Sequence, residues 1–168
     1  MQLLDHVLFD SLLQQASQMS RKRCAYNLHQ SLNENAQRVV IAMQPGSYVR
    51  PHLHQEPQPY ELCIVLQGCI DMLLFDEQGH LLQRLKLAAG STQCAVELTA
   101  GQYHSLVVTE AGAVFIEVKQ GPFDPAAPRY FADWAPDEQD ADASHYYQWM
   151  LTAKVGESFL TGQAMSTI

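Results

Sequence analysis

Residues 61–90 read ELCIVLQGCIDMLLFDEQGHLLQRLKLAAG. Three short runs rich in leucine, isoleucine and valine are each closed by a glycine, and these glycines stand eleven residues apart. The same spacing continues after this stretch at Gly101 and Gly112, and Gly46 lies two such intervals before Gly68. Apolar runs of strand length between regularly spaced glycine turns predict an all-β core, a sandwich or small barrel, over residues 36–120.

The segment before this core is predicted to be helical. Apolar residues recur at three- and four-residue steps in residues 4–23, the period of an amphipathic helix. We assign residues 1–35 to this helix and a lid segment. At this length the chain, residues 1–168, is expected to form a single domain.

The segment after the core is rich in proline and aspartate. Four prolines in residues 122–136 exclude a central strand or a long helix. Residues 121–168 are therefore expected to wrap over the barrel and to include a short helix within 143–155. The wrap is expected to be anchored on the barrel by its aromatic side chains, Phe123, Tyr130, Phe131 and Trp134.

Composition and charge exclude several classes of protein. The chain is 47% apolar and 17% charged, which is typical of globular proteins, and its formal charge is −8. Negative charge argues against binding to nucleic acid or to anionic membranes. The four cysteines contain no CxxC pair, and no apolar run approaches the ~18 residues of a membrane span. The N-terminus has no basic region and carries two aspartates within its first ten residues, unlike a signal peptide, so we expect a cytoplasmic protein.

One group of residues has the composition of a metal site. His52 and His54 stand two apart, so on an extended strand their side chains share a face. Glu61 opens the next apolar run, and His104 opens a much later one. Three imidazoles and one carboxylate would suit Zn²⁺, Fe²⁺, Ni²⁺ or Mn²⁺. The sequence alone does not choose among these ions.

These residues stand in segments that resemble the two cupin motifs: GSYVRPHLH (46–54), ELCIVLQG (61–68) and TAGQYH (99–104). The resemblance covers residues 38–120. It implies a double-stranded β-helix, that is, a jelly-roll barrel, with one divalent metal ion inside its mouth. The implied ligands are His52, His54, Glu61 and His104.

A closer resemblance extends to the WbuC-type cupin family. The segments that carry it are RKRCAYNLH (21–29), PHLHQEPQPYELCIVLQG (51–68), AGQYHSLV (100–107), EVKQGPFDP (117–125) and DWAP (133–136). Members of this family are often encoded among genes for O-antigen and other surface polysaccharides. The resemblance therefore implies a sugar-derived small polar ligand.

Two features depart from the cupin pattern. Six residues, QEPQPY (55–60), separate His54 from Glu61, where the general motif has three or four. Glu56 therefore competes with Glu61 as the carboxylate ligand, although Glu61 keeps its spacing to Gly68. Val108 stands where many cupins have an asparagine near the metal, which leaves ligation by His104 unaffected.

Further residues are candidates for contact with a substrate. Asn27 and His29 share a face if their segment is extended, and they follow two arginines suited to phosphate or carboxylate. We therefore predict substrate-binding roles for Arg21, Arg23, Asn27, His29 and Tyr60. The alternative is that the arginines are solvated and that His29 packs on the barrel. His29 or Glu56 would move a proton if the protein is catalytic.

Three functions are compatible with this reading. In the first, the metal acts as a Lewis acid on a sugar or sugar nucleotide, in an isomerase- or epimerase-like reaction. In the second, the same ligands hold Fe²⁺ in an oxygenase. The third is a non-catalytic cupin that binds a small ligand. Strands such as residues 61–66 are apolar on both faces, which favours a homodimer formed by sheet packing.

Overall fold

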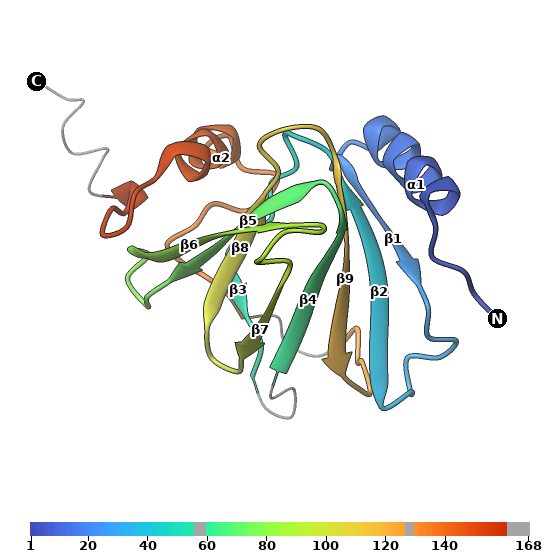
Figure 1. The fold of residues 1–168 in the computed structure, drawn as a ribbon. Coiled ribbons are helices and arrows are strands. Elements are labelled where there is room, and N and C mark those ends of the chain that lie inside the picture. Colours follow the sequence, from blue (N-terminus) through green and yellow to red (C-terminus); the bar gives the residue numbers. More distant parts are fainter. Residues whose placement is uncertain (56–59, 127–129, 161–168) are drawn as a thin grey trace, which may run out of the picture.

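The computed structural model describes residues 1–55, 60–126 and 130–160. Two antiparallel sheets of five strands face each other, with a helix outside each sheet (Figure 1). The first sheet has the order β1 (Arg23–Asn27), β2 (Ala36–Met43), β9 (Ala113–Gln120), β4 (Tyr60–Gln67) and β7 (Ala95–Thr99). The second has the order β10 (Tyr130–Phe131), β3 (His52–Leu53), β8 (Tyr103–Val107), β5 (Cys69–Phe75) and β6 (Leu81–Ala88).

This arrangement is the predicted jelly roll, and the glycine spacing reflects how its strands connect. Gly68 separates β4 in one sheet from β5 in the other, with a φ of +73°. A Cβ atom at this position would lie 2.7 Å from the carbonyl oxygen of Gly112. Only glycine combines the left-handed conformation with so close an approach of two backbone segments. The chain therefore crosses between the sheets at a position that requires glycine.

The core between the two sheets is built from side chains that alternate inward along the strands. Cys63 and Val65 of β4 meet Phe115 of β9, Met72 of β5 and Leu106 of β8. All of these side chains are buried. This apolar core fixes the positions of strands β4, β8 and β9, which carry the polar centre described below.

Helix α1 (His6–Gln18) covers the outer face of the first sheet, where it packs on β1 and β2 (Figure 1). Its buried residues are Phe9, Leu12 and Ala16, and the helix is capped by Asp5, which accepts a hydrogen bond from the Leu8 amide at 3.0 Å. The helix is shorter than the predicted span of residues 4–23. It ends because the chain reverses at Lys22, with a φ of 54°, and enters β1.

Helix α2 (Ala143–Thr152) covers the second sheet and agrees with the helix predicted within residues 143–155. Its buried residues Tyr146 and Met150 belong to a cluster with Phe75 of β5 and Leu81 of β6. None of the helices among the described residues is long and apolar enough to cross a membrane.

The expectation that four aromatic residues anchor the C-terminal wrap is only partly correct. Trp134 packs against Phe75, with ring centroids 5.2 Å apart, and against Tyr103. Three other aromatic side chains remain substantially exposed, namely Phe123, Tyr130 and Phe131. Tyr130 and Phe131 form the two-residue strand β10, which pairs with β3 at the edge of the second sheet.

Candidate metal centre

Three histidines converge between the two sheets. His52 begins β3 and pairs directly with His104 of β8, while His54 follows β3 by one residue. The ring centroids of His52 and His104 lie 4.4 Å apart, and those of His54 and His104 lie 5.4 Å apart. One ligand nitrogen from each ring lies within 4.8 Å of those of the other two. The predicted sharing of a face by His52 and His54 therefore brings both rings to His104.

Two of these rings are oriented by the same local contact. His52 Nδ1 lies 3.0 Å from the carbonyl oxygen of Arg50, and His104 Nδ1 lies 2.9 Å from that of Gln102. A carbonyl oxygen only accepts, so Nδ1 must carry the proton in each ring. In the neutral ring Nε2 then has a free lone pair, as a metal ligand requires.

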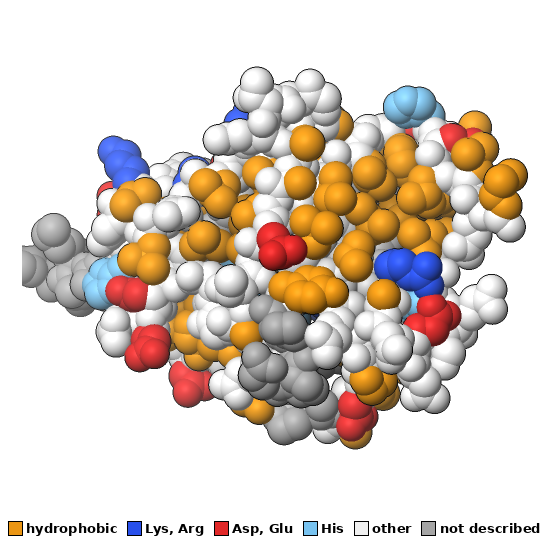
Figure 2. Space-filling model, turned by 60° about the horizontal axis from the view of Figure 1, so that its bottom comes forward, with side chains coloured by type: hydrophobic (Ala, Val, Ile, Leu, Met, Phe, Trp, Pro, Cys, Tyr) orange, Lys and Arg blue, Asp and Glu red, His pale blue; other side chains and the backbone are white. Residues whose placement is uncertain are grey.

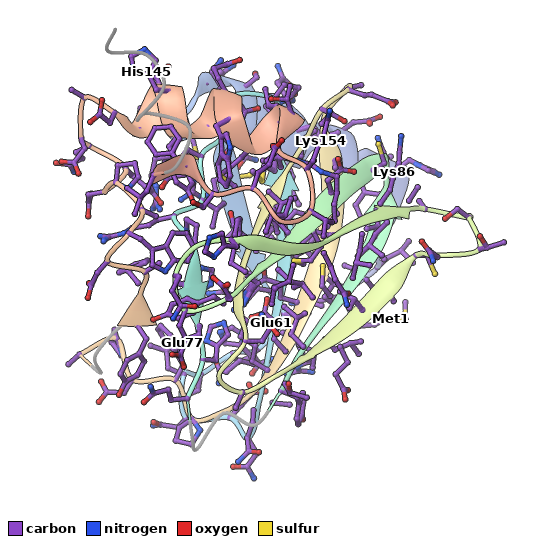
Figure 3. All side chains as sticks on the ribbon, turned by 90° about the vertical axis from the view of Figure 1, so that its left-hand side faces the viewer. Met1, Glu61, Glu77, Lys86, His145 and Lys154 are labelled. Atoms are coloured by element: carbon purple, nitrogen blue, oxygen red, sulfur yellow. The ribbon has the colours of Figure 1, made fainter. Side chains whose placement is uncertain are left out.

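Glu61 enters the centre from β4, in the opposite sheet (Figure 3). Its side chain is 3% exposed, and its Oε2 lies 2.6 Å from His54 Nε2 and 3.6 Å from His104 Nε2. Burial alone would raise the pKa of this carboxyl. The charge of Lys119 and the contacts with the two imidazoles outweigh burial and hold its pKa well below the usual range. Glu61 is therefore an ionised carboxylate beside the three histidines.

Lys119 and Glu117, both on β9, complete the polar centre. Lys119 Nζ lies 3.1 Å from Glu61 Oε2, 3.0 Å from Glu117 Oε2 and 3.5 Å from His54 Nε2. Burial disfavours the charge on Lys119, but the two carboxylates outweigh it and raise the pKa of the ammonium group. The two residues were not among the predicted site residues. The alternation in residues 113–119 could have indicated them, because it places two charged residues on one face of an otherwise apolar strand.

The donor set and its surroundings fit a divalent transition metal ion. Three neutral imidazoles and one carboxylate are suitable ligands for such ions. Burial, followed by the charges of His104 and Lys119, lowers the pKa of His52 well below its usual value, so this ring is neutral near pH 7. Within the described residues, His104 Nε2 is buried and has no hydrogen-bond partner. A buried nitrogen lone pair that accepts no hydrogen bond is costly in free energy unless an ion or a ligand satisfies it.

The remaining predicted residues lie apart from this centre. His29 follows β1 and is buried, and its Nδ1 accepts a hydrogen bond from the Arg38 amide at 3.1 Å. Strands β2 and β9 separate β1 from β4, which carries Glu61. Asn27 is exposed at the end of β1, and Tyr60 is half-buried at the start of β4. Glu56 lies outside the described residues.

Arg21 and Arg23 are brought together with each other, but not with the histidines. Arg21 Nε lies 2.7 Å from Glu138 Oε2, and Arg23 Nη2 lies 2.5 Å from Glu138 Oε1. The two arginines line a separate pocket together with Arg50, which the sequence analysis did not select as a ligand-binding residue.

Comparison with known proteins places the chain in a family. Residues 4–87 match the family described as "Domain of unknown function (DUF6016)". The chain belongs to the DUF6016 family. No curated protein matches it.

Among solved structures, this DUF6016 chain is similar to oxalate oxidase in complex with the substrate analogue glycolate, with a TM-score of 0.50 and 18% identity over 71% of this chain and 62% of that one. It also matches KdgF from Halomonas sp., with a TM-score of 0.47 and 17% identity over 61% of this chain and 81% of that one. A cupin superfamily protein from Desulfitobacterium hafniense DCB-2 matches with a TM-score of 0.46 and 15% identity, over 58% and 76% of the two chains.

At these identities the likeness concerns the fold alone. Together with the two facing antiparallel sheets and the strand order, it confirms the predicted cupin fold with its N-terminal and C-terminal helices. The chemistry of the protein has to be argued from its own residues.

Proposed function

We propose that this protein binds one divalent transition metal ion through His52, His54, Glu61 and His104. The observation that carries the proposal is the convergence of the three rings, two of which have Nδ1 bound to a backbone carbonyl. Such contacts fix the tautomer and the direction of a histidine ligand before any ion binds. A cluster of surface histidines would have no need of them.

Charge supports the same proposal. Burial and the charge of Glu61 raise the pKa of Glu117, while Lys119 acts in the opposite direction. With both carboxylates ionised, Lys119 protonated and the imidazoles neutral, the centre has one net negative charge. A dication reverses this sign and leaves one net positive charge. Because this charge lies between the sheets, where screening by water is weak, it favours a ligand that offers an anionic or lone-pair oxygen.

We further propose that the bound molecule is a sugar or sugar nucleotide, on the strength of the resemblance to WbuC-type cupins. A bound metal ion of this class supplies Lewis-acid polarisation of a carbonyl or of vicinal hydroxyls, which suits isomerisation or epimerisation. Lys119 lies 3.1 Å from Glu61 Oε2, and its charge keeps this carboxylate ionised. Glu56 remains our proposed proton carrier, on sequence grounds.

The first test is metal content, measured by mass spectrometry on untagged protein purified without chelators. We expect close to one metal ion per chain in the wild type and almost none in His52→Ala/His104→Ala. His145→Ala is the matched control because its side chain is 78% exposed, and it should keep the metal. Metal-free wild type, or equal metal in the double variant, would refute the proposal.

The identity of the metal separates the remaining hypotheses. Zinc, nickel or manganese would favour Lewis-acid chemistry on a sugar. Iron would favour the oxygenase, which should then consume O₂ in the presence of its substrate and lose activity when zinc replaces iron. Stoichiometric metal with tight ligand binding and no turnover would favour a non-catalytic cupin.

We also infer that two copies of the chain associate through the outer face of β4 and β9. Half-buried aliphatic side chains gather on this face beside α1, namely Leu62, Ile64, Leu66, Ile116 and Val118. A broad area of hydrophobic side chains is visible on the face of the molecule shown in Figure 2. The occupant that best suits a two-sided apolar strand in this chain is the same strand of a second copy.

A further inference from the structure

A pocket with a volume of about 590 Å³ lies beside the candidate metal centre and has arginines as its main polar groups. It is formed by the start of β1, the segment that leads into β3, and the chain that follows β10. The residues on which the argument depends are Arg21, Arg23, Tyr48, Arg50, Phe131 and Glu138. Arginine forks are the side chains best suited to bind carboxylate or phosphate groups.

Two of the three guanidinium groups are held in place by the protein itself. Arg23 is 16% exposed, and its Nη1 donates to Ser47 Oγ at 3.1 Å and to the carbonyl oxygen of Tyr48 at 2.7 Å. Arg50 Nη2 donates to the carbonyl oxygen of Ala132 at 2.8 Å, and its guanidinium lies 5.3 Å from the centre of the Phe131 ring. These contacts orient the donors in advance, which lowers the entropic cost of binding an anion.

An internal carboxylate now takes the place that an anion would occupy. Glu138 receives two hydrogen bonds from Arg21, both at 2.7 Å, and one from Arg23 at 2.5 Å. Its neighbour Asp137 lies 3.3 Å from Arg50 Nη1. The two carboxylates belong to one turn, in which the Asp137 amide donates to Asp140 Oδ2 at 2.8 Å. Two adjacent carboxylates from one turn thus pair with three arginines, which leaves one net positive charge among these five groups.

This contact is built to be exchangeable. In two of the three ion pairs one partner is exposed, namely Arg21 at 60% and Asp137 at 58%, whereas Arg23 and Glu138 are 16% and 24% exposed. Water therefore reaches the Arg21 and Asp137 ends of these contacts. Exposed ion pairs contribute little to stability and exchange readily. Among the described residues, the buried Nε of Arg50 also has no hydrogen-bond partner, so this arginine has a donor to spare.

We propose that this pocket binds an oxyanion, a phosphate or carboxylate group of a small ligand, and that Glu138 occupies the site in its absence. The ligand displaces the Glu138 carboxylate from Arg21 and Arg23. This site is separate from the four proposed metal ligands and does not require a metal ion. Arg50 connects the two, because its backbone carbonyl accepts the hydrogen bond of His52.

The test is calorimetric titration of the full chain, free of added metal, with inorganic phosphate at constant ionic strength. Glu138→Gln removes the competing charge and should bind phosphate at least several-fold more tightly than the wild type. Glu110→Gln makes the same change in net charge at an exposed residue that pairs with Lys86 outside the pocket, and it should behave as the wild type. Equal affinity in the two variants, or no binding in either, would overturn the proposal.

A second variant tests the arginines without disturbing the fold. Arg23 is largely buried, so we choose the exposed Arg21, in the Glu138→Gln background. Arg21→Ala should weaken phosphate binding several-fold, while Lys86→Ala, which removes one exposed positive charge outside the pocket, should not. Equal weakening by the two substitutions would show only a general effect of charge and would count against the site.

Two further titrations identify the ligand and the place of binding. Succinate in place of phosphate distinguishes a carboxylate ligand from a phosphate ligand, and tighter binding of either by Glu138→Gln supports the site. His104→Ala should keep its affinity for phosphate, because His104 does not line the pocket. If His104→Ala abolishes binding while Glu138→Gln leaves it unchanged, the anion binds at the histidine centre and the proposal is wrong.

Discussion

His52 and His104 lie on adjacent strands and direct their rings by the same short-range contact, from Nδ1 to the carbonyl two residues earlier. Lys119 then separates two carboxylates that would otherwise repel each other, since its ammonium lies within 3.1 Å of both Glu61 and Glu117. The two rings are therefore oriented by nearby backbone carbonyls, and the two carboxylates are held by the Lys119 side chain. The polar centre behaves as one network, in which loss of a single member leaves another charge unpaired.

The substitution Lys119→Met tests whether the charged groups of the polar centre depend on one another. Without the ammonium, the mostly buried carboxylates of Glu61 and Glu117 lose the cation that they share, and the free energy of unfolding should fall by about 3 kcal/mol. Urea unfolding monitored by circular dichroism measures this loss. The control is Lys86→Met, because Lys86 is 61% exposed and pairs only with the exposed Glu110, so it should cost less than about 1 kcal/mol.

A bound metal ion should restore part of the stability that Lys119→Met loses. A dication held by the three histidines and Glu61 supplies the positive charge that Lys119→Met removes, and ligands that bind the folded state stabilise it. Added Zn²⁺ should therefore raise the urea midpoint of Lys119→Met by more than it raises that of the wild type. Equal destabilisation by the two lysine substitutions would contradict the network.

At the scale of elements, the glycine turns on either side of β6 differ in what they contact. Gly79, between β5 and β6, has a φ of +84° and also lies under Trp134, since a Cβ atom there would be 2.8 Å from the indole ring. Gly90, between β6 and β7, has a φ of +70° but no atom within 4 Å of such a Cβ. The Gly79 turn thus packs the β5–β6 hairpin against Trp134 of the C-terminal wrap, whereas the Gly90 turn only reverses the chain.

The two glycines form a matched pair for mutation. Gly90→Ala should cost only the strain of the left-handed conformation, about 1 kcal/mol. Gly79→Ala carries the same strain and must also push Trp134 away from Phe75, so its cost should be about 2–3 kcal/mol. Urea midpoints of the two variants check this difference. Equal costs would mean that the contact between Gly79 and Trp134 does not hold the C-terminal segment on the barrel.

On the scale of the whole molecule, the helices cover the outer surfaces of the two sheets to different extents. Helix α2 covers the second sheet, while α1 covers β1 and β2 of the first (Figure 1). The aliphatic side chains on the outer face of β4 and β9 are left half-buried. A second copy of the chain would complete the burial of this face. The net charge of −8 keeps molecules apart in general, so association requires such a specific apolar contact.

Light scattering after size-exclusion chromatography tests this arrangement. The wild type should have about twice the chain mass of 18.8 kDa, and Ile64→Glu, which places a charge in the proposed interface, should have the mass of one chain. Leu82→Glu is the control, since Leu82 is an exposed apolar residue on β6, away from this face, and this variant should remain dimeric. A wild type that elutes as a monomer would refute the dimer.

Strand alternation, glycine spacing and the His-x-His pattern are short-range properties, so the local sequence determined the all-β core, the two helices and the candidate metal ligands, while the resemblance to the cupin motifs indicated the jelly-roll fold. The groups that adjust the centre depend on tertiary structure. Lys119 meets Glu61 only because β9 pairs with β4, and Arg50 joins Arg23 only because the segment before β3 lies beside the start of β1. Glu138 reaches these arginines across more than a hundred residues of chain. Electrostatic partners of this kind are set by which strands become neighbours, and no spacing in the sequence encodes that choice.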